Sequence, residues 1–307
     1  MADRLLVIGE MLIDIARTPD GLVAEHVGGS PANVAMGLAR LGHDVDFATV
    51  LGRDDRGLRC TTLLDEVGVA LLPGSVRDEA TSTADATIDA NGSATYLFDL
   101  HWDLPAVTPT AGTIHVHTGS IATTLTPGEA EVTAALTDAR ARATTSYDPN
   151  VRPTIMGVPA TVRPRVEELV ALSDVVKASD EDVAFLYGDT PVEEVMGRWA
   201  ALGPGLVVVT LGRDGVTYRV SSTGETTHEP TAADRVVDTV GAGDSFMAGL
   251  VSGLVDLGLL GGPDARARLA AAGTSDVAPA VARALATSGL TVGRAGAYAP
   301  TRAEIGL

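Results

Sequence analysis

The 307-residue chain is poor in cysteine, lysine and aromatic side chains. Cys60 is its only cysteine, which excludes an intrachain disulfide and a metal site built from several cysteines. Lys177 is its only lysine, and a net charge of -18 excludes the basic face that nucleic-acid-binding proteins need. Aromatic residues make up 4% of the chain, so few side chains can hold a planar base.

Long apolar runs are also missing. No stretch of about 18 consecutive apolar residues occurs, so the sequence predicts no transmembrane helix. Residues 1–17 contain no basic segment followed by a long apolar stretch, and we therefore predict a cytoplasmic protein. Asn91-Gly92-Ser93 matches a glycosylation sequon, but in a protein that is not exported it predicts only a hairpin turn.

What the chain does contain is an alternation of short β-branched runs with helix-like periodic segments. The predicted strands span residues 5–8, 45–50, 113–117, 144–147, 174–177 and 206–210. The predicted helices span residues 32–41, 57–67, 127–140, 161–172 and 192–202. This alternation predicts an α/β fold with a mainly parallel sheet and helices on both faces, and the length allows a single domain over residues 1–307 or a core with a small appendage. Ligands of such folds bind beyond the carboxyl ends of the strands.

Two segments break this alternation, at about residues 13–27 and 83–102. Each has shorter alternating patterns and a turn-forming sequence near its middle, which is typical of a β-hairpin. We expect the two hairpins to form a small β-sheet lid over the active site. The alternative is that they are peripheral decorations of the main sheet.

A phosphate site is indicated at residues 238–244, which end in Gly241-Ala242-Gly243-Asp244 and lead into an apolar-periodic helix. The unpaired N–H groups and the dipole of a helix start attract phosphate, so we expect an anion site that needs no cationic side chain. Asp244 in the first turn can accept the proton of a hydroxyl that attacks a phosphoryl group. The alternative is that Asp244 only caps the helix.

Sugar-binding candidates lie near the N-terminus. Gly28 and Gly29 permit close backbone approach, and Asn33 offers both a donor and an acceptor to a polyol. Asp14 follows the first predicted strand, and its carboxylate can accept hydrogen bonds from adjacent hydroxyls. An ordinary loop beside a helix and a surface aspartate would produce the same patterns.

Two polar turns follow later strands. Arg152, in the turn at residues 148–152, can offer its planar guanidinium to phosphate, unless that turn is only structural. Lys177 precedes residues 179–182, whose oxygen-bearing side chains suit Mg²⁺, directly or through its waters. A capping box between Ser179 and Asp182 is the competing interpretation, and both can hold at once.

The segment at residues 210–215 can let a nucleotide lie against its glycine-rich backbone, although an ordinary hairpin has the same pattern. His115 and His117 share one face of a strand, but no third metal ligand is evident, and we predict ordinary packing. The chain has no Gly-x4-Gly-Lys-Ser/Thr loop and no Gly-x-Gly-x-x-Gly after the first strand, which removes the commonest nucleotide-binding families.

Residues 28–35, with Gly42 and Gly52, and residues 238–251 together resemble the two signatures of the ribokinase-like (PfkB) family of carbohydrate kinases. The order of predicted elements agrees with that family from Leu5 to Tyr298. The resemblance implies an α/β fold with a three-layer αβα core, a mainly parallel sheet and a small β-sheet lid. It also implies ATP as phosphoryl donor, a sugar as acceptor, Mg²⁺ as cofactor and K⁺ as an optional second cation.

The resemblance also assigns roles to particular residues. The catalytic group is Asp244 as base, Gly241, Ala242 and Gly243 as anion hole, and Arg152. The substrate-binding group is Asp14, Gly28, Gly29, Asn33 and Asp238. The nucleotide-binding group is Thr210, Gly212, Gly215, Lys177 and Ser179. The metal-binding group is Asp182 for Mg²⁺ and Asp238 for a monovalent cation. The family often has Asn-x-x-Glu where this chain has Ser179-x-x-Asp182, so we expect the shorter Asp182 to reach Mg²⁺ through water.

Within the family the chain looks most like fructokinases and the related 2-keto-3-deoxygluconate kinases, because Gly9-Glu10 precedes Asp14, a polar turn occupies residues 148–152 and a Ser-Asp-Glu form occupies residues 179–181. Fructose is therefore the first-choice substrate. A 2-keto-3-deoxygluconate kinase is the alternative, but Arg17 is the only candidate partner for an acidic sugar. Ribokinase and nucleoside kinase rank lower, because a base needs an apolar slot and the main aromatic candidates of the lid are Tyr96, Phe98 and Trp102.

Two alternatives belong to other classes: a catalytically silent sugar-binding protein on the same fold and a dinucleotide-dependent dehydrogenase. The intact Asp244 disfavours the first, and the missing glycine fingerprint disfavours the second. We expect the partners to be a sugar and ATP, without nucleic acid or membrane, and we expect a homodimer formed through the lid.

Overall fold

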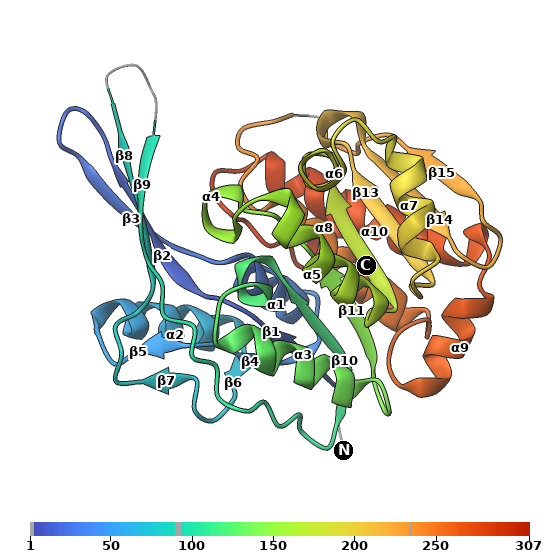
Figure 1. Ribbon diagram of the computed structural model, residues 1–307, viewed down its shortest axis with the longest axis horizontal. Helices are drawn as coiled ribbons and strands as arrows, with labels where there is room; N and C mark the ends of the chain where they lie inside the picture. Colours follow the sequence, from blue (N-terminus) through green and yellow to red (C-terminus); the bar gives the residue numbers. More distant parts are fainter. Residues whose placement is uncertain (1–2, 90–93, 234) are drawn as a thin grey trace.

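The computed structural model describes residues 3–89, 94–233 and 235–307. The strands of its main sheet are β1 (Arg4–Ile8), β4 (Asp44–Ala48), β6 (Val69–Leu71), β10 (Thr113–Gly119), β11 (Thr144–Asp148), β12 (Val175–Ser179), β13 (Leu206–Thr210), β14 (Val216–Val220) and β15 (Thr226–Glu229). They lie in the order β15-β14-β13-β12-β11-β10-β1-β4-β6 (Figure 1). From β13 to β6 in this spatial order, neighbouring strands are parallel. Strands β14 and β15 pair antiparallel at the other edge, next to β13. The predicted mainly parallel sheet is therefore confirmed.

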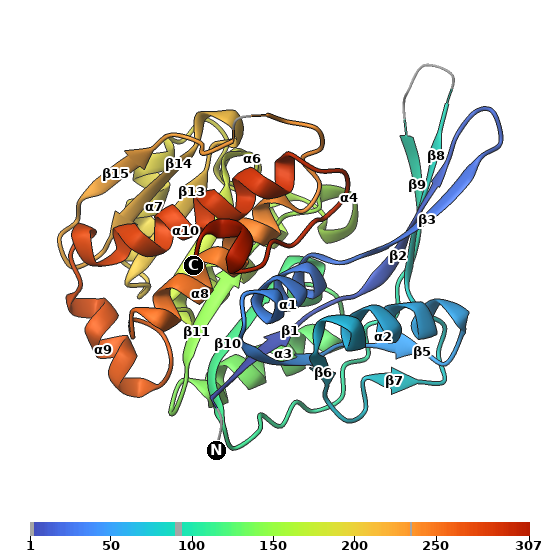
Figure 2. The same cartoon turned by 180° about the vertical axis from the view of Figure 1, so that it is seen from behind.

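Helices cover both faces of this sheet (Figures 1 and 2). One face carries α1 (Ser30–Arg40), α8 (Ala242–Asp256), α9 (Pro263–Ala271) and α10 (Thr274–Val292). The opposite face carries α3 (Gly128–Ala139), α5 (Pro159–Ala171), α6 (Asp180–Tyr187) and α7 (Val192–Ala200). The remaining elements are α2 (Asp55–Val67), α4 (Pro153–Met156), the pair β5 (Leu51–Gly52) and β7 (Val76–Arg77), and the 3-10 turns η1 (Ser120–Thr123), η2 (Gly212–Asp214) and η3 (Ala303–Ile305).

Strand β1 is apolar from Leu5 to Ile8 and β13 is apolar from Leu206 to Val209, because both faces of these strands are buried. Leu5 and Val7 of β1 point into the core beneath α1 and α8, whereas Leu6 and Ile8 point into the core beneath α3 and α5. Side chains alternate between the two faces of a strand, so a strand between two helical layers can bury a continuous apolar run. The predicted three-layer core follows directly from this pattern.

A second sheet is formed by β2 (Leu12–Arg17), β3 (Val23–Gly28), β8 (Thr83–Ile88) and β9 (Ala94–Asp99), in the order β3-β2-β8-β9. Each predicted segment is an antiparallel pair, and β2 pairs with β8 in parallel to join them. The joined sheet forms an arm that extends beyond the core (Figures 1 and 2). The predicted turn at Asn91-Gly92 lies outside the described residues.

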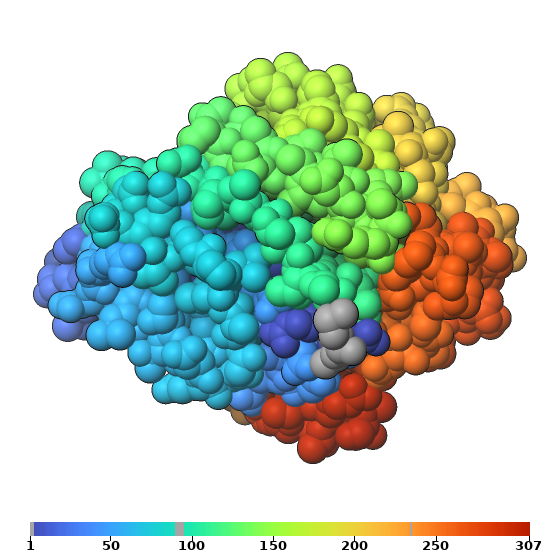
Figure 3. All heavy atoms as spheres, turned by 90° about the horizontal axis from the view of Figure 1, so that it is seen from below, coloured from blue at the N-terminus to red at the C-terminus, as the bar shows by residue number. Residues whose placement is uncertain are grey.

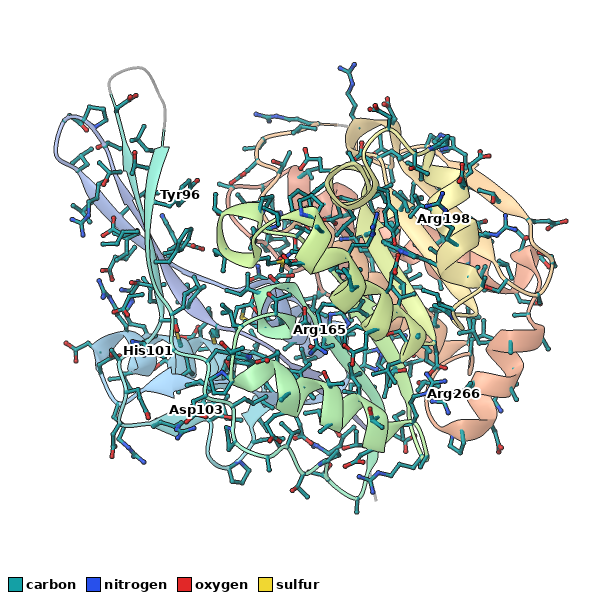
Figure 4. All side chains as sticks on the ribbon, viewed as in Figure 1. Tyr96, His101, Asp103, Arg165, Arg198 and Arg266 are labelled. Carbon is teal, nitrogen blue, oxygen red and sulfur yellow. The ribbon has the colours of Figure 1, made fainter. Side chains whose placement is uncertain are left out.

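One face of this arm carries Asp14, His26, Tyr96 and Phe98, because paired residues of neighbouring strands share a face. The rings of Tyr96 and Phe98 stack with centroids 5.7 Å apart, and Figure 4 shows Tyr96 pointing toward the core. The third predicted lid aromatic, Trp102, does not belong to this face. It is buried in the core, where its Nε1–H donates to the carbonyl of Ala122 at 2.9 Å. That part of the expectation was wrong because residues beyond β9 return to the main sheet.

Helices α9 and α10 were not predicted; both are rich in alanine, and α10 contains an internal proline, Pro279, which usually ends a helix. Helix α10 packs on α8 through Gly249 and Gly253. A Cβ at Gly249 would lie 2.8 Å from the Cα of Ala284, and one at Gly253 would lie 2.6 Å from the Cα of Ala280. The contact therefore depends on the two helix backbones approaching closely rather than on large apolar side chains.

The N-terminal and C-terminal parts of the chain meet on the face seen in Figure 3. Helix α9 is attached to the main sheet there by Arg266, whose Nε donates to Asp174 Oδ1 at 2.6 Å (Figure 4). None of the helices in the described parts of the chain has the length and apolar character needed to cross a bilayer.

Candidate functional site

A cavity of about 1360 Å³ lies where the carboxyl ends of the central strands meet the base of the arm. Its wall includes almost all of the residues that the sequence singled out for binding or catalysis. They are Asp14, Gly28, Gly29, Asn33, Arg152, Lys177, Ser179, Asp182, Thr210, Gly212, Gly215, Gly241, Ala242, Gly243 and Asp244. The chain thus brings together segments from residue 14 to residue 244 at the edge where α/β folds bind ligands.

Asp244 lies in the first turn of α8, and two side chains from the start of α1 hold its carboxylate. Ser30 Oγ donates to Oδ1 at 2.6 Å, and Asn33 Nδ2 donates to Oδ2 at 2.8 Å. A carboxylate has about four acceptor positions, so these bonds orient Asp244 and leave positions open for a substrate hydroxyl. Sequence reasoning missed the role of Ser30, and the signal was its place in the same glycine-rich motif as Asn33.

The start of α8 has open backbone donors. Among the described residues, the N–H groups of Gly243 and Asp244 have no acceptor, whereas that of Ala242 donates to the carbonyl of Thr239 at 3.2 Å. Gly241 has a φ of +74°, and a Cβ there would lie 2.7 Å from the Cβ of Ala297. Only glycine fits this turn, and the free amides with the helix dipole form an anion site.

A cation lies beside this anion site, although the sequence had suggested a site formed by backbone amides alone. Lys177 Nζ lies 2.9 Å from where a Cβ of Gly243 would be. The side chain comes from β12, is 5% exposed, and donates to Asp148 Oδ2 of β11 at 2.8 Å. Lys177 lies on β12, and the fold of the main sheet brings it next to the first turn of α8, which begins 65 residues later in the chain. No short sequence motif spans that separation.

The Asp148–Lys177 pair is charged at neutral pH. Burial raises the pKa of Asp148 to about 6, although the Lys177 ammonium opposes that rise. Burial works to lower the pKa of Lys177, but the carboxylates of Asp148, Asp182 and Asp244 together outweigh it and the pKa is raised overall. A protonated lysine is therefore maintained in the wall of the cavity.

Asp14 and Gly28 form the opposite end of the cavity. A Cβ at Gly28 would lie 2.0 Å from Asp14 Oδ2, so the carboxylate packs directly on the glycine. Burial raises the pKa of Asp14, and Arg152 acts to lower it. Gly29 has a φ of +111°, and its missing side chain leaves room for the carbonyl of Glu10. His26, directly opposite Asp14 on β3, also lines the cavity and was not identified from the sequence.

Arg152 is exposed and faces the same cavity. Its Nη1 donates to Asn150 Oδ1 at 2.8 Å and to the carbonyls of Asn150 and Val151 at 3.3 and 3.1 Å. Within the described parts of the chain, its Nε and Nη2 donate to no acceptor. One edge of the guanidinium is thus available to bind a phosphate oxygen.

Ser179 and Asp182 form the predicted capping box at the start of α6. Ser179 Oγ accepts from the Asp182 N–H at 3.1 Å, and Asp182 Oδ2 accepts from the Ser179 N–H at 2.8 Å. Asp182 Oδ1 accepts the N–H of Val151 at 2.7 Å. Both oxygens of Asp182 are therefore engaged by the backbone. The described residues contain no group of three or more metal-ligating side chains.

The nucleotide-side wall begins at the turn between β13 and β14. Gly212 and Gly215 have φ values of +55° and +96°, and a Cβ at Gly215 would lie 2.1 Å from the carbonyl of Glu229. The cavity is also lined by Leu285 and Ser288 of α10 and by the apolar Val236, which is 61% exposed. An apolar groove beside a glycine-rich turn fits a planar ring. The sequence predicted the turn with Gly212 and Gly215 but not the part of this wall formed by Leu285 and Ser288, because α10 was not predicted.

Asp238 does not line the cavity, unlike the other predicted site residues. Its Oδ1 accepts the N–H of Val240 at 3.0 Å, and its Oδ2 accepts the N–H of Gly296 at 2.8 Å. These bonds lower the pKa of Asp238. The carboxylate connects the segment before α8 to the segment after α10, so direct contact with a substrate does not fit its position.

His115 and His117 are packed as predicted. Both are buried, and both hydrogen-bond to Ser146 Oγ at 2.9 Å, while His115 also bonds to Thr144 Oγ1 at 2.9 Å. Burial lowers the pKa of His115 to about 4 and that of His117 to about 3, so both rings are neutral. They belong to the interior of the main sheet.

Comparison with known proteins gives a consistent result. The family described as pfkB family carbohydrate kinase matches residues 2–304. A fructokinase of Klebsiella pneumoniae is 34% identical over 280 residues, which cover 88% of this chain and 89% of the relative. A fructokinase double mutant of Vibrio cholerae O395, crystallised with fructose, ADP and potassium, superposes with a TM-score of 0.78 at 26% identity, covering 99% of this chain and 97% of its own. A Xylella fastidiosa fructokinase with bound ATP has a similar fold, with a TM-score of 0.84 at 24% identity, covering 99% of this chain and 97% of its own.

Proposed function

Because the chain belongs to the pfkB family of carbohydrate kinases, we propose that it transfers the γ-phosphoryl group of ATP to a hydroxyl of fructose. The observation that carries the proposal is the position of Asp244. Its carboxylate is held by Ser30 and Asn33 next to free helix-start amides, inside a cavity large enough for a sugar and a nucleotide. A protein that only bound sugar would need neither the base nor the amides.

In the proposed reaction Asp244 accepts the proton of the sugar hydroxyl as its oxygen forms a bond to the γ-phosphorus. The bond between that phosphorus and the bridging oxygen of ADP breaks, and ADP carries away the electron pair. The amides of Gly243 and Asp244 stabilise the charge on the phosphoryl oxygens, with Gly241 and Ala242 shaping the turn. The protein contributes mainly position and charge in such a transfer.

The remaining cavity residues support binding in this proposal. Asp14, Gly28, Gly29 and Asn33 hold the sugar, and the free edge of Arg152 binds phosphate oxygens. The nucleotide-side residues are Thr210, Gly212, Gly215, Lys177 and Ser179.

Magnesium supplies charge neutralisation on the ATP phosphates when it is bound. Both oxygens of Asp182 already accept backbone N–H groups, so its remaining lone pairs fit a hydrated Mg²⁺ through water. We assign Asp238 only to a monovalent-cation loop. Its carboxylate bridges two backbone segments whose carbonyls are the ligand type that a K⁺ ion prefers.

Fructose is favoured over an acidic sugar by the state of Arg17. Its Nη2 donates to Asp85 Oδ2 at 2.7 Å and its Nε also bonds the same carboxylate, so the guanidinium is already neutralised within the arm. An acidic substrate such as 2-keto-3-deoxygluconate would find Arg152 as its cation, which the proposal uses for phosphate. Among the relatives found, the fructokinase of Klebsiella pneumoniae supports the neutral sugar.

We also propose a cytoplasmic enzyme that forms a homodimer through the arm. Leu22, Val23 and Leu97 of the arm are 66%, 55% and 73% exposed, which is apolar surface that a second copy could cover.

Replacing Asp244 with Asn tests the proposal. We expect kcat for fructose to fall by about 10²–10⁴-fold, because the amide cannot accept the proton, while fructose and ATP still bind. The measurement is ADP release with Mg²⁺ and ATP, run on fructose, 2-keto-3-deoxygluconate, ribose and adenosine, with sugar affinity measured by calorimetry.

Near-normal turnover in D244N would remove Asp244 from the role of base. Turnover by the unaltered enzyme of another sugar in preference to fructose would correct the substrate. An unaltered protein that binds fructose without releasing ADP would instead support the catalytically silent sugar-binding alternative.

A further inference from the structure

Lys177 has more hydrogen-bonding capacity than the protein uses. An ammonium has three N–H donors, and among the described residues Nζ makes one hydrogen bond, to Asp148 Oδ2 at 2.8 Å. The side chain is 5% exposed, so water does not readily satisfy the remaining donors. The group nevertheless lies in the wall of the cavity, next to Gly243. A buried charged group with unused donors beside a cavity indicates an oxygen-rich ligand.

The charges around Lys177 explain why it stays protonated. Three carboxylates act on it, those of Asp148, Asp182 and Asp244, and each favours its charged form. Burying an ion pair such as Asp148–Lys177 gives little or no net stability, because desolvation offsets the attraction between the charges. The pair is therefore poorly explained as a stabilising contact and better explained as a means of holding one positive charge at the cavity wall.

The position of the Lys177 ammonium indicates that the ligand is an anion bound at the start of α8. Nζ lies 2.9 Å from the Cβ position of Gly243, whose N–H is one of the free amides at the start of α8. Lys177 and these amides therefore face the same small volume, with the carboxylate of Asp244 in the same turn. An anion held there would be surrounded by backbone donors on one side and an ammonium on the other.

We propose that Lys177 is a catalytic residue whose ammonium binds the phosphoryl group during its transfer, and that Asp148 is the positioning residue that aims it. The inference rests on the proposed function. Lys177 keeps its proton throughout: the hydroxyl proton passes to Asp244, the new O–P bond forms, and the bond to the ADP oxygen breaks. Lys177 acts by stabilising charge that develops on the phosphoryl and leaving-group oxygens.

The test compares K177M, K177R and D148N with the unaltered enzyme. In K177M we expect kcat to fall by about 10²–10³-fold, the scale for loss of one preorganised donor, with the KM for sugar and the Kd for ADP changed by less than about threefold. ADP lacks the γ-phosphoryl group, so its affinity separates loss of transition-state charge from loss of the nucleotide site. K177R should recover part of kcat because it retains a positive charge.

D148N tests the positioning role. Without the carboxylate the pKa of Lys177 falls, so we expect the alkaline limb of the kcat profile to move to lower pH, together with a smaller loss of kcat than in K177M. A purely structural role for Asp148 would lower stability without moving this limb. A D148N profile that matches that of the unaltered enzyme would overturn the positioning role.

Folding is checked by circular dichroism and thermal midpoint for each variant. If K177M leaves Asp148 as an unpaired buried charge and does not fold, the K177M/D148N double variant removes both charges and should show the same loss of kcat. A folded K177M or double variant with kcat within about threefold of the unaltered enzyme would refute the inference. If the unaltered enzyme phosphorylates none of the sugars, the proposed function fails instead, and the two failures are therefore distinguishable.

Discussion

The contact between Gly28 and Asp14 shows how one absent side chain sets the position of a binding group. Asp14 Oδ2 lies 2.0 Å from where a Cβ of Gly28 would be. Gly28 does not have a positive φ, so its backbone conformation suits other residues and only the space is restricted. Gly28 is therefore required because it leaves space for the Asp14 carboxylate, and not because of its backbone conformation.

Replacing Gly28 with Ala should therefore displace Asp14 without unfolding β3. We expect kcat/KM for the sugar to fall by up to about 10²-fold, the scale for a misplacement of about 1 Å, with the KM for ATP little changed. Steady-state kinetics with each substrate varied in turn measures both effects. An unchanged KM for the sugar would mean that Asp14 does not contact it.

Gly197 provides the matched control for this substitution. It lies inside α7, away from the cavity, and a Cβ there meets no atom within 4 Å. G197A should raise the free energy of unfolding by about 0.5–1 kcal/mol, because alanine loses less backbone entropy than glycine in a helix, and activity should be unaffected.

At the scale of elements, the starts of α6 and α8 both face the cavity but differ in their backbone donors. The capping box of Ser179 and Asp182 satisfies N–H groups at the start of α6. The start of α8 has glycine at its cap and no side-chain cap, so the amides of Gly243 and Asp244 are free. An uncapped helix start is unfavourable in isolation, and here it forms the anion site.

Helix α2, unlike α8, has a side-chain cap at its start, and the capping residue Asp54 also hydrogen-bonds to Thr81 at the base of the arm. Asp54 accepts from the N–H of Gly57 at 2.7 Å and from the N–H and Oγ1 of Thr81 at 2.9 and 2.7 Å, just before β8 begins. These hydrogen bonds lower the pKa of Asp54, although desolvation acts to raise it. One carboxylate therefore connects a core helix to the arm.

Replacing Asp54 with Ala should lower the free energy of unfolding by about 2 kcal/mol, the upper range for a helix cap, because three hydrogen bonds are lost. Chemical denaturation measures the change. D55A, one residue later in the exposed first turn, removes only a favourable interaction with the helix dipole and should cost about 0.3–1 kcal/mol. Equal losses in the two variants would contradict a capping role for Asp54.

At the scale of the whole molecule, buried ionisable groups make stability depend on pH in opposite directions. His115 and His117 are neutral in the fold with lowered pKa values, so they contribute stability that is lost as the pH falls below their unfolded pKa of about 6.5. Glu10 acts in the other direction. Burial raises its pKa to about 7, although hydrogen bonds such as that from the Ala122 N–H at 3.1 Å oppose the rise.

Because Glu10 binds its proton more tightly in the folded state, its contribution to stability falls as the pH rises from about 4.5 to about 7. We expect E10Q, which keeps an acceptor for Ala122 and cannot ionise, to gain stability relative to the unaltered protein across this window. The gain should reach about 3 kcal/mol at most, from a shift of about 2.5 pH units. Chemical denaturation at pH 5 and pH 8 measures it, and a constant difference between the two proteins would contradict the raised pKa.

The sequence predicted the parts of the fold that carry their own local signal. The runs at residues 5–8 and 206–210 are strands because continuous apolar β-branched residues suit a sheet buried on both faces. Helix α10, which contains Pro279, was not predicted, and the part of the nucleotide-side wall formed by Leu285 and Ser288 was missed with it. For the site, Asp244 and Asn33 were identified because each lies in a glycine-rich motif at a predicted helix start. The free amides of such a start bind anions, so the local sequence alone indicates a binding site.

By itself, then, the sequence determined the layers, the two hairpins and the glycine-flanked helix starts, since each depends on residues that are neighbours along the chain. Only the tertiary structure decided that Ser30 and Asn33 hold Asp244, that Lys177 lies beside Gly243 with Asp148 as its partner, and that Asp238 stands outside the cavity. The physical reason is that strand order and helix packing, which bring Ser30 and Asp244 together across 214 positions, follow from burial of the whole core.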